Sequence, residues 1–174
     1  YNTDFQILDK FLAKGGNLFI AYNAVDANPE TQYAVAVNTN LENWLKEKGI
    51  VIESSFVVDK QCMPIVFTQN KAGYPVKSTI NFPLIPQFTN FYKHPINTGL
   101  QNVVLEFASQ CKDATKNNVK FIPLIKSSDK TAIIKPPFFF DLYKDWTDKD
   151  FPLSNLTVAA MLQGQIVGNK TSRI

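Results

Sequence analysis

The residue that could act as a general base for nucleophilic catalysis is His94, which is the only histidine in the chain. A serine or cysteine nucleophile needs such a base within hydrogen-bond reach. The two thiols, Cys62 and Cys111, do not lie in the glycine-flanked turn between a strand and a helix that exposes a nucleophile. His94 precedes Pro95, and a surface position or a local hydrogen bond explains it without catalysis. We therefore expect no nucleophilic enzyme, and the two cysteines are either disulfide-bonded or free and buried.

Two aspartates are the best-placed candidates for a polar binding or catalytic site. Asp26 and Asp59 each follow an apolar run that is typical of a strand. Ligands of open α/β sheets gather beyond the carboxyl ends of the strands, and glycosidases use two carboxylates about 5 to 9.5 Å apart. Capping of a neighbouring helix or turn explains each aspartate equally well. A hydrolase that uses this pair is therefore one open alternative.

The sequence offers no site of standard form for a metal or a cofactor. Zinc sites need cysteines or histidines at short spacing, and phosphate-binding loops need glycines in fixed patterns; neither arrangement occurs. A carboxylate cluster at 141–150 lacks the spacing of a calcium-binding loop, and Lys144 and Lys149 interrupt it. The cluster consists of Asp141, Asp145, Asp148 and Asp150. We expect a solvated charged turn there, with no metal and no cofactor.

Lysines and aromatic residues alternate between Lys60 and Leu105, where the chain has no acidic residue. Exposed aromatic rings beside cations bind glycans, anionic polymers or protein partners. The candidate binding residues of this segment are Lys77, Phe88, Tyr92 and Lys93. A phenylalanine-rich core surrounded by lysines is the alternative. Nucleic acid is not an expected partner, because the first arginine of the chain is Arg173 and arginine is the preferred reader of bases.

Length and composition indicate one folded domain. The chain has 174 residues and a net charge of +3, and charged residues make up 19% of it against 13% for aromatic residues. A chain of about 100–200 residues can fold on its own core without a metal or a disulfide. These values exclude a disordered chain, a collagen-like chain, a coiled coil and a strongly cationic nucleic-acid binder. No apolar run approaches the ~20 residues that a membrane-spanning helix requires.

Two helix–glycine–strand units predict an α/β fold. In the first unit, apolar residues recur at helical spacing over 5–12, and Gly15 and Gly16 end the predicted helix. The run 18–22 follows directly. Because it is apolar throughout and does not alternate, it predicts a strand covered on both faces, as in a parallel sheet.

The second unit has the same order. A capping box formed by Thr39 and Glu42 starts the predicted helix, and Gly49 ends it. An extended segment then runs from Ile50 to Asp59. Two such units within sixty residues indicate a sheet whose strands are joined by helical crossovers.

The rest of the chain has a different composition. Prolines break helices and restrict strands to short or edge pieces, so we expect an ordered, proline- and aromatic-rich excursion at about 60–98. One short helix is predicted near 141–146. Predicted strands lie at 65–68, 103–107, 119–125, 132–134 and 156–162. The overall prediction is a mixed α/β sheet with helical crossovers and a β-rich second half.

The order of these elements resembles a known family. The phrases Leu8…Gly15-Gly16-Asn17-Leu18 and Leu41…Trp44-Leu45…Gly49-Ile50…Val58-Asp59 are similar to successive helix–glycine–strand phrases of the ABC-transporter auxiliary domain in gliding-motility GldG-like proteins. The segments 107–109 (Phe-Ala-Ser) and 151–164 resemble two later phrases of that family. The resemblance implies a flavodoxin-like or class I glutamine-amidotransferase-like fold. It carries over no catalytic motif, and neither cysteine lies in the elbow that an amidotransferase needs.

The resemblance also implies a setting. We expect residues 1–174 to form a single extracytoplasmic (periplasmic) auxiliary domain of an ABC transporter at the bacterial inner membrane, anchored by segments absent from this sequence. The expected partners are the permease and ATPase subunits of the same complex, in gliding motility or surface export. The expected function is non-catalytic binding. The alternatives are a carbohydrate-active hydrolase that uses Asp26 and Asp59, and a glycan-binding module without turnover.

Overall fold

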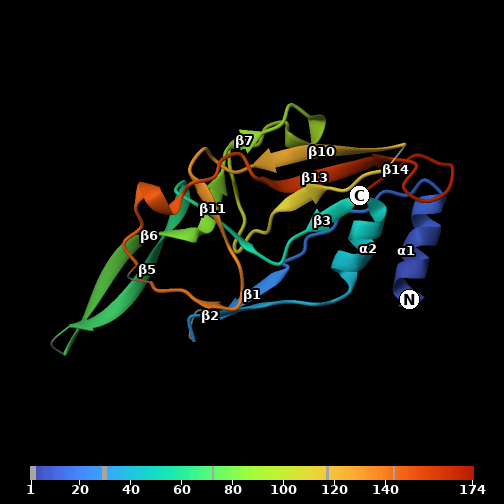
Figure 1. The fold of residues 1–174 in the computed structure, drawn as a ribbon. Coiled ribbons are helices and arrows are strands. Elements are labelled where there is room, and N and C mark those ends of the chain that lie inside the picture. The colour runs from blue at the N-terminus through green and yellow to red at the C-terminus, as the bar shows by residue number, and fades with distance from the viewer. Residues whose placement is uncertain (1–2, 29–30, 72, 117, 143) are drawn as a thin grey trace.

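Antiparallel strands dominate the computed structural model of the chain, which describes residues 3–28, 31–71, 73–116, 118–142 and 144–174 (Figure 1). Every pair of hydrogen-bonded strands among these residues is antiparallel. The prediction of a flavodoxin-like or glutamine-amidotransferase-like α/β sheet with helical crossovers is therefore wrong. The fold is β-rich and consists of several small antiparallel sheets. The α-helices in the described part of the chain are α1 (Thr3–Ala13) and α2 (Leu41–Lys48).

The strands of the described residues form five groups. The four-stranded sheet runs in the order β14 (Ser172–Arg173), β13 (Thr157–Gly164), β10 (Val119–Lys126) and β7 (Asn90–Phe91). A second sheet contains β1 (Val25–Asn28), β2 (Tyr33–Ala36) and β12 (Phe138–Phe139). A third contains β5 (Cys62–Lys71), β6 (Tyr74–Phe88) and β8 (Val103–Val104). Two strand pairs complete the fold: β3 (Ile50–Ile52) with β9 (Cys111–Asp113), and β4 (Phe56–Asp59) with β11 (Thr131–Ile134).

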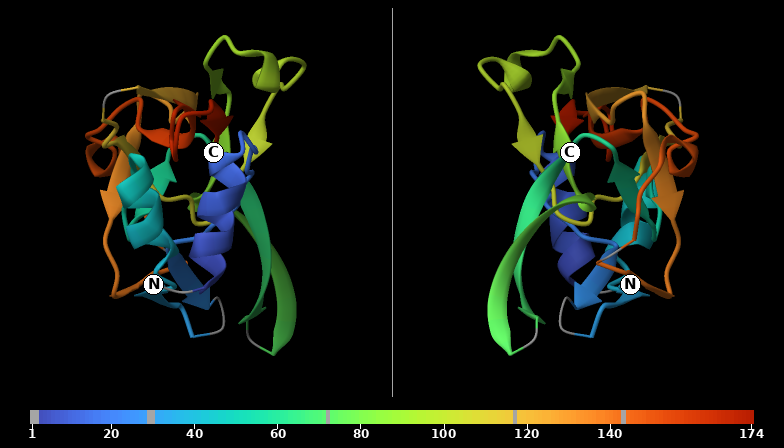
Figure 2. Two further views of the ribbon diagram at one scale, coloured as in Figure 1. Left: turned by 90° about the vertical axis from the view of Figure 1, so that its right-hand side faces the viewer. Right: turned by 90° about the vertical axis from the view of Figure 1, so that its left-hand side faces the viewer.

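The two helices pack against each other at one end of the molecule (Figures 1 and 2). The rings of Phe5 and Trp44 stack with centroids 5.7 Å apart. The carboxylate of Asp9 accepts a hydrogen bond from the Trp44 indole N–H at 3.0 Å and lies 2.7 Å from the Lys48 ammonium group. One aspartate of α1 therefore binds two side chains of α2.

Local signals predict the end of α2 at Gly49 correctly, whereas its N-cap is Asn40, one residue after the Thr39 of the predicted capping box, and Asn40 makes no side-chain cap hydrogen bond. The Thr39 backbone N–H donates to the Glu42 carboxylate at 3.4 Å, and the Leu41 N–H donates to the Thr39 hydroxyl at 3.3 Å. At the other end, Gly49 has a φ of +115°, which favours glycine, and its N–H donates to two carbonyls of the last turn. These contacts involve neighbours in sequence, so the sequence pattern alone reveals them.

The apolar run 18–22 is not a strand. The Leu18 N–H donates to the Arg173 carbonyl at 2.9 Å, and Asn17 forms an isolated bridge with the same residue, but the run beyond them is irregular. Phe19 is 90% exposed. The prediction fails because an apolar run marks any apolar environment, and here the run borders a cavity instead of lying between two layers of helices.

Within the part of the chain that the structure describes, the core is divided into three apolar clusters. One surrounds Phe56 and Phe82, where β4 packs against β6. A second surrounds Phe88 and Leu124. In the third, the helices pack against β13 through side chains that include Trp44 and Leu162. Several small sheets can thus share apolar surface without a single continuous sheet.

The excursion predicted at 60–98 is mainly a long β-hairpin, formed by β5 and β6 (Figure 1). The sequence predicts short or edge strand pieces here; both strands are long, but β5 is an edge strand, and the expected strand at 65–68 lies within it. The two strands accommodate their prolines for three reasons. β5 is an edge strand, and a register shift lies beside Pro64. In addition, β6 pairs with β8 only at Gln87 and Phe88. Over most of its length, β6 therefore has an open edge on which a missing N–H costs no hydrogen bond.

The other strand predictions are largely confirmed. The segments expected at 119–125, 132–134 and 156–162 lie in β10, β11 and β13. The segment 103–107 contains only the short β8, and Phe107 has a φ of +54°. The prediction of a short helix near 141–146 is wrong, because the described residues of that segment are not helical. A 3₁₀ turn follows the segment, at Asp148–Asp150.

Candidate functional site

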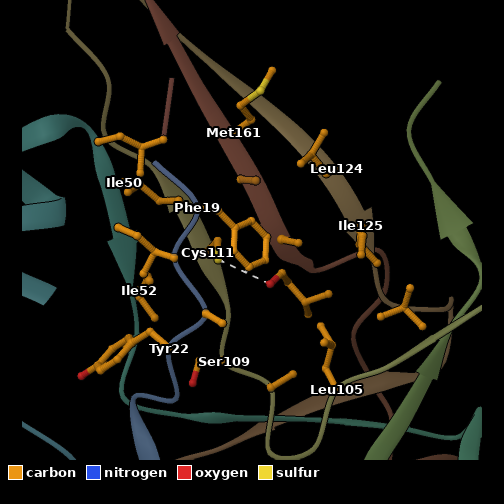
Figure 3. A pocket seen from close by; sticks show the side chains of 18 of the residues that line it. Phe19, Tyr22, Ile50, Ile52, Leu105, Ser109, Cys111, Leu124, Ile125 and Met161 are labelled. Atoms are coloured by element: carbon orange, nitrogen blue, oxygen red, sulfur yellow. Dashed lines mark hydrogen bonds between the residues drawn. The ribbon is translucent and has the colours of Figure 1, made fainter. Parts of the chain in front are cut away.

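A cavity of about 840 Å³ lies beside the four-stranded sheet (Figure 3). Its walls come from β3, β9, β10 and β13, together with the connecting segments 17–23 and 103–109. Cavities of about 300–1,000 Å³ hold small molecules. The sequence pattern reveals neither the strand pairings nor the cavity, because the elements that form them are far apart along the chain.

Branched aliphatic side chains form the walls of this cavity. In Figure 3, Ile50 and Ile52 of β3 lie on one side of the space, and Leu124 and Ile125 of β10 lie on the other. Leu105 lies at the lower edge of the same view. The site can therefore bind apolar groups by excluding water from them.

Polar side chains also line the cavity, among them those of Ser109 and Cys111. The hydroxyl of Ser109 is buried and has no hydrogen-bond partner among the described residues, and the residue is only 8% exposed. The thiol of Cys111 lies 3.6 Å from the Val158 carbonyl, to which it donates. Burial raises the pKa of Cys111 to about 12, so the thiol stays protonated and is a poor nucleophile at neutral pH.

The segment 17–23 lines one side of the cavity. Phe19 is part of this lining, although the residue is 90% exposed. Tyr22 fastens the segment, because its hydroxyl donates to Glu42 at 3.1 Å; burial is the main cause that raises the pKa of this phenol. The charged residues that line the cavity, Glu106 and Arg173, are both exposed.

The structure places the two predicted carboxylates in different environments. Asp26 is exposed on β1, whereas Asp59 is fully buried at the end of β4. The oxygens of Asp59 accept hydrogen bonds from the Gln61 N–H, the Ser128 N–H and the Ser128 hydroxyl. Neither carboxylate lines the cavity. The capping interpretation accounts for Asp59.

The predicted lysine and aromatic site residues do not form one patch. Lys77 is exposed on β6, and Phe88 is 1% exposed within the core. Tyr92 and Lys93 line a second hollow, together with His94, beside the short β7. The phenylalanine-rich core that was the alternative interpretation thus accounts for Phe88, and the exposed members of the set lie on two separate elements.

The remaining candidates for chemistry have structural contacts. His94 Nδ1 accepts a hydrogen bond from the Ile96 N–H at 3.3 Å and caps a 3₁₀ turn at Pro95–Asn97. The thiols of Cys62 and Cys111 are free. Burial, followed by the negative charge of Asp59, raises the pKa of Cys62. These contacts explain the three residues without a catalytic role.

Two aspartates of the acidic cluster at 141–150 form ion pairs with lysines. Lys60 lies 2.5 Å from the Asp148 carboxylate and Lys144 lies 2.8 Å from that of Asp150. No group of three or more histidine, cysteine or acidic side chains within the described ranges could hold a metal ion. The predicted solvated charged turn agrees with these contacts.

Comparison with known proteins gives the family. The model of the family described as "ABC-type uncharacterized transport system" matches residues 2–174, so the chain belongs to this family. A curated protein of Borreliella burgdorferi, named only as an uncharacterized protein, is 28% identical over 136 residues, which are 75% of this chain and 26% of that protein. The chain thus spans about a quarter of that relative's length. No solved structure matches the chain.

Membership in the family confirms the coarser part of the sequence prediction. The chain belongs to a family described by an ABC-type transport system, as the resemblance implied. Among the described residues, no helix combines the length and the apolar character needed to cross a bilayer.

Proposed function

We propose that this chain is a non-catalytic interaction domain that docks onto another subunit of its ABC-type transport system. The single observation that carries the proposal is the β5–β6 hairpin, which extends beyond the rest of the described chain (Figure 1). Its family supplies the transport setting. The following contacts make this hairpin suitable for binding a protein.

The hairpin has a buried root and an exposed outer part. Near the root, Phe82 and Leu84 are 5% and 1% exposed and pack in the core cluster around Phe56. Further out, Val66 is 65% exposed and Tyr74 is 75% exposed. A rigidly anchored element that presents apolar side chains to solvent is typical of a surface that a partner covers.

The outer hairpin also has free strand edges. β5 pairs with β6 alone, and β6 reaches β8 only near its end. Unpaired backbone groups along such edges bind a strand of another protein by extending the sheet. Lys77 is exposed on β6, and the segment from Lys60 to Leu105 has no acidic residue, so the complementary partner surface is neutral or acidic.

We propose the permease or ATPase complex as the partner, and the extracytoplasmic side of a bacterial inner membrane as the location. The resemblance described above supports both. It also supports the narrower proposal of a role in gliding motility or surface export. Family membership supports the transport complex, whereas these narrower statements are left to experiment.

The test is co-purification of the full-length protein, carrying an affinity tag, from detergent-solubilised membranes. The wild type is expected to retain the permease and ATPase subunits of its own complex, identified by mass spectrometry. The double variant Val66→Asp, Lys77→Glu places acidic side chains on the exposed outer hairpin and is expected to retain at least tenfold less of them. The matched control is Val35→Asp, a 40% exposed valine on β2.

Equal recovery from the hairpin variant and the control would show that the hairpin is not the docking element. Recovery of neither subunit by the wild type would contradict the proposed function itself. Thermal unfolding of each variant, followed by circular dichroism, verifies that the changes leave the fold intact.

A further inference from the structure

We propose that the free edge of β5, and not that of β6, binds an extended strand of the transport subunit onto which the chain docks, and that this strand carries an acidic side chain facing Lys77. The inference rests on the proposed function and deepens it, because it names the edge of the hairpin that is used and the chemistry of the segment that binds there. Three features support it: the prolines of the hairpin (Figure 1), the difference between its two edges, and the position of Lys77.

The prolines show which backbone groups of β5 point away from β6. Residues opposite each other in an antiparallel pair alternate between pairs that exchange N–H···O bonds and pairs that do not. Pro64 of β5 lies opposite Asn81, and Pro75 of β6 lies opposite Asn70. Because a proline has no N–H to exchange, these are the non-bonded positions. Pro64 and Asn70 are an even number of positions apart on β5, so the two prolines give the same result.

Val66 and Thr68 therefore direct their backbone N–H and carbonyl groups to the outer edge of β5. They lie two and four positions after Pro64, in a stretch whose register with β6 is unbroken, and so they share its orientation. No strand of the described residues pairs with this edge. Both side chains are exposed. The edge thus presents a short row of unpaired donors and acceptors to which another extended segment can bind.

The two edges of the hairpin differ in their protection against such pairing. Proteins block the edges of sheets with prolines and lysines. The outer edge of β6 has Pro75, which removes an N–H, and the exposed Lys77 two positions later. From Ile65 to Asn70, β5 has neither a proline nor a charged residue. The edge that is open to a partner strand is therefore that of β5.

Lys77 indicates the charge of the added strand. It lies opposite Thr68, so the two side chains are on the same face of the hairpin, and both are exposed. Among the described residues, Lys77 forms no ion pair. A strand added to β5 lies about 10 Å from β6, which is twice the spacing of neighbouring strands. An extended lysine and a glutamate or aspartate side chain can meet across this distance, so an acidic residue beside Thr68 complements the site.

The same charges disfavour a second copy of the chain as the occupant. The segment from Lys60 to Leu105 contains lysines and no acidic residue. The hairpin of a second copy would therefore offer Lys77 no partner and would add to the positive charge of the sheet. Another protein with an acidic strand meets both requirements.

The experiment compares two threonine-to-proline variants of the tagged full-length protein by co-purification from detergent-solubilised membranes. Thr68→Pro removes an N–H from the outer edge of β5. Its matched control is Thr79→Pro on β6, because Thr79 is exposed, lies opposite Val66 and directs its N–H to the outer edge of β6. We expect Thr68→Pro to retain about tenfold less of the permease and ATPase subunits, since a carbonyl of the added strand loses its donor. Thr79→Pro is expected to retain wild-type amounts.

A second pair of variants tests the acidic residue of the partner. Lys77→Glu reverses the charge beside Thr68 and is expected to lower the retained amount about two- to fivefold, as for the loss of one exposed ion pair. The control is Lys93→Glu, which makes the same change at an exposed lysine outside the hairpin. It is expected to leave the retained amount unchanged.

Hydrogen exchange of the purified protein, followed by NMR, tests the edge without any partner. The amides of Val66 and Thr68 are expected to exchange faster than those of Ile65 and Phe67, which point to β6. Slow exchange at Val66 and Thr68 would overturn the proposal. Protection of these two amides that increases with protein concentration would identify a second copy as the occupant and would also overturn it.

The outcomes separate this inference from the proposed function. If the wild type retains the subunits and Thr68→Pro retains as much as Thr79→Pro, the β5 edge is not used and only this inference fails. Loss of binding by Thr79→Pro alone would assign the role to β6 and would have the same consequence. Recovery of neither subunit by the wild type contradicts the proposed function and this inference together. If Thr68→Pro does not fold, the comparison of Lys77→Glu with Lys93→Glu and the hydrogen exchange decide.

Discussion

Asp59 fixes the turn that follows β10 by accepting two hydrogen bonds from one residue, Ser128. One carboxylate oxygen accepts from the Ser128 backbone N–H at 2.8 Å, and the other accepts from the Ser128 hydroxyl at 2.7 Å. Asp59 is fully buried, and it also accepts from the Gln61 N–H at 2.8 Å. The carboxylate therefore connects the end of β4 to a segment far along the chain.

This relationship predicts that Asp59 is important for stability. Asp59→Asn keeps the shape of the side chain but replaces an accepting oxygen with an N–H donor, which then faces other donors. We expect the free energy of unfolding, measured by urea denaturation, to fall by about 2–4 kcal/mol. The matched control Asp26→Asn, at an exposed position on β1, should change it by less than about 0.5 kcal/mol. Equal effects at both positions would contradict a clamping role for Asp59.

The sequence predicts the elements that depend on near neighbours. The ends of α2 follow from contacts within a few residues of Thr39 and Gly49, so the residue types there suffice. The strands at 119–125 and 156–162 are likewise visible, because β-branched and apolar residues are concentrated in them. Their mutual pairing is antiparallel and includes register shifts.

The arrangement of those elements depends on distant contacts, and the sequence pattern does not contain them. Thr131 and Val58 are 73 positions apart, yet the Thr131 hydroxyl donates to the Val58 carbonyl at 2.8 Å. The run 18–22 shows the same limit, since its apolar residues predict burial but not the kind of surroundings. Its lack of alternation is the one sequence signal that could have indicated the cavity, and it is shared by buried strands.

Gly164 is predicted to be intolerant of any side chain. It has a φ of +148°, and a Cβ there would overlap the Asn118 carbonyl oxygen and lie 2.9 Å from the Val119 Cα. Both obstacles belong to the backbone of the neighbouring strand segment, which cannot rotate away. We expect Gly164→Ala to lower the free energy of unfolding by about 3 kcal/mol or more in urea denaturation.

The control for this prediction is Gly99→Ala. Gly99 has a φ of +86°, but a Cβ there would meet nothing within 4 Å. Its substitution isolates the cost of the backbone conformation, which is about 1 kcal/mol. If the two variants lose equal stability, the steric argument for Gly164 is wrong.

The lowered pKa of Asp150 predicts that this residue contributes to the loss of stability in acid. Its hydrogen bond with Lys144, followed by those with Thr147, lowers the pKa of this carboxyl to about 2. A group whose pKa is lower in the folded than in the unfolded state stabilises the fold above its ordinary pKa of 3.8, and this contribution is lost as the pH falls to about 2. Asp150→Asn should therefore lower the melting temperature at pH 5, and the difference from wild type should vanish near pH 2.

Salt offers a second measure of the same contact. Because the ion pair is exposed to solvent, a high salt concentration should reduce the difference between Asp150→Asn and wild type at pH 5. The comparison variant is Asp26→Asn, at an exposed position on β1. A stability difference at Asp150 that persists unchanged at pH 2 would show that the carboxylate charge is not its source.

The raised pKa of Cys111 predicts that its thiol is unreactive and that the folded protein loses stability in alkali. Burial raises its pKa from 9.0 to about 12, so the thiolate population at pH 8 is about a thousandfold below that of an ordinary cysteine. Mass spectrometry after treatment with iodoacetamide should find Cys62 modified first in the native protein, and both thiols modified in urea. Since the folded state holds the proton more tightly, this group's stabilisation is complete below pH 9 and is lost as the pH rises towards 12. The free energy of unfolding of Cys111→Ala should accordingly fall less steeply at alkaline pH than that of the wild type. Equally rapid alkylation of the two thiols in the native protein would contradict the burial on which this prediction depends.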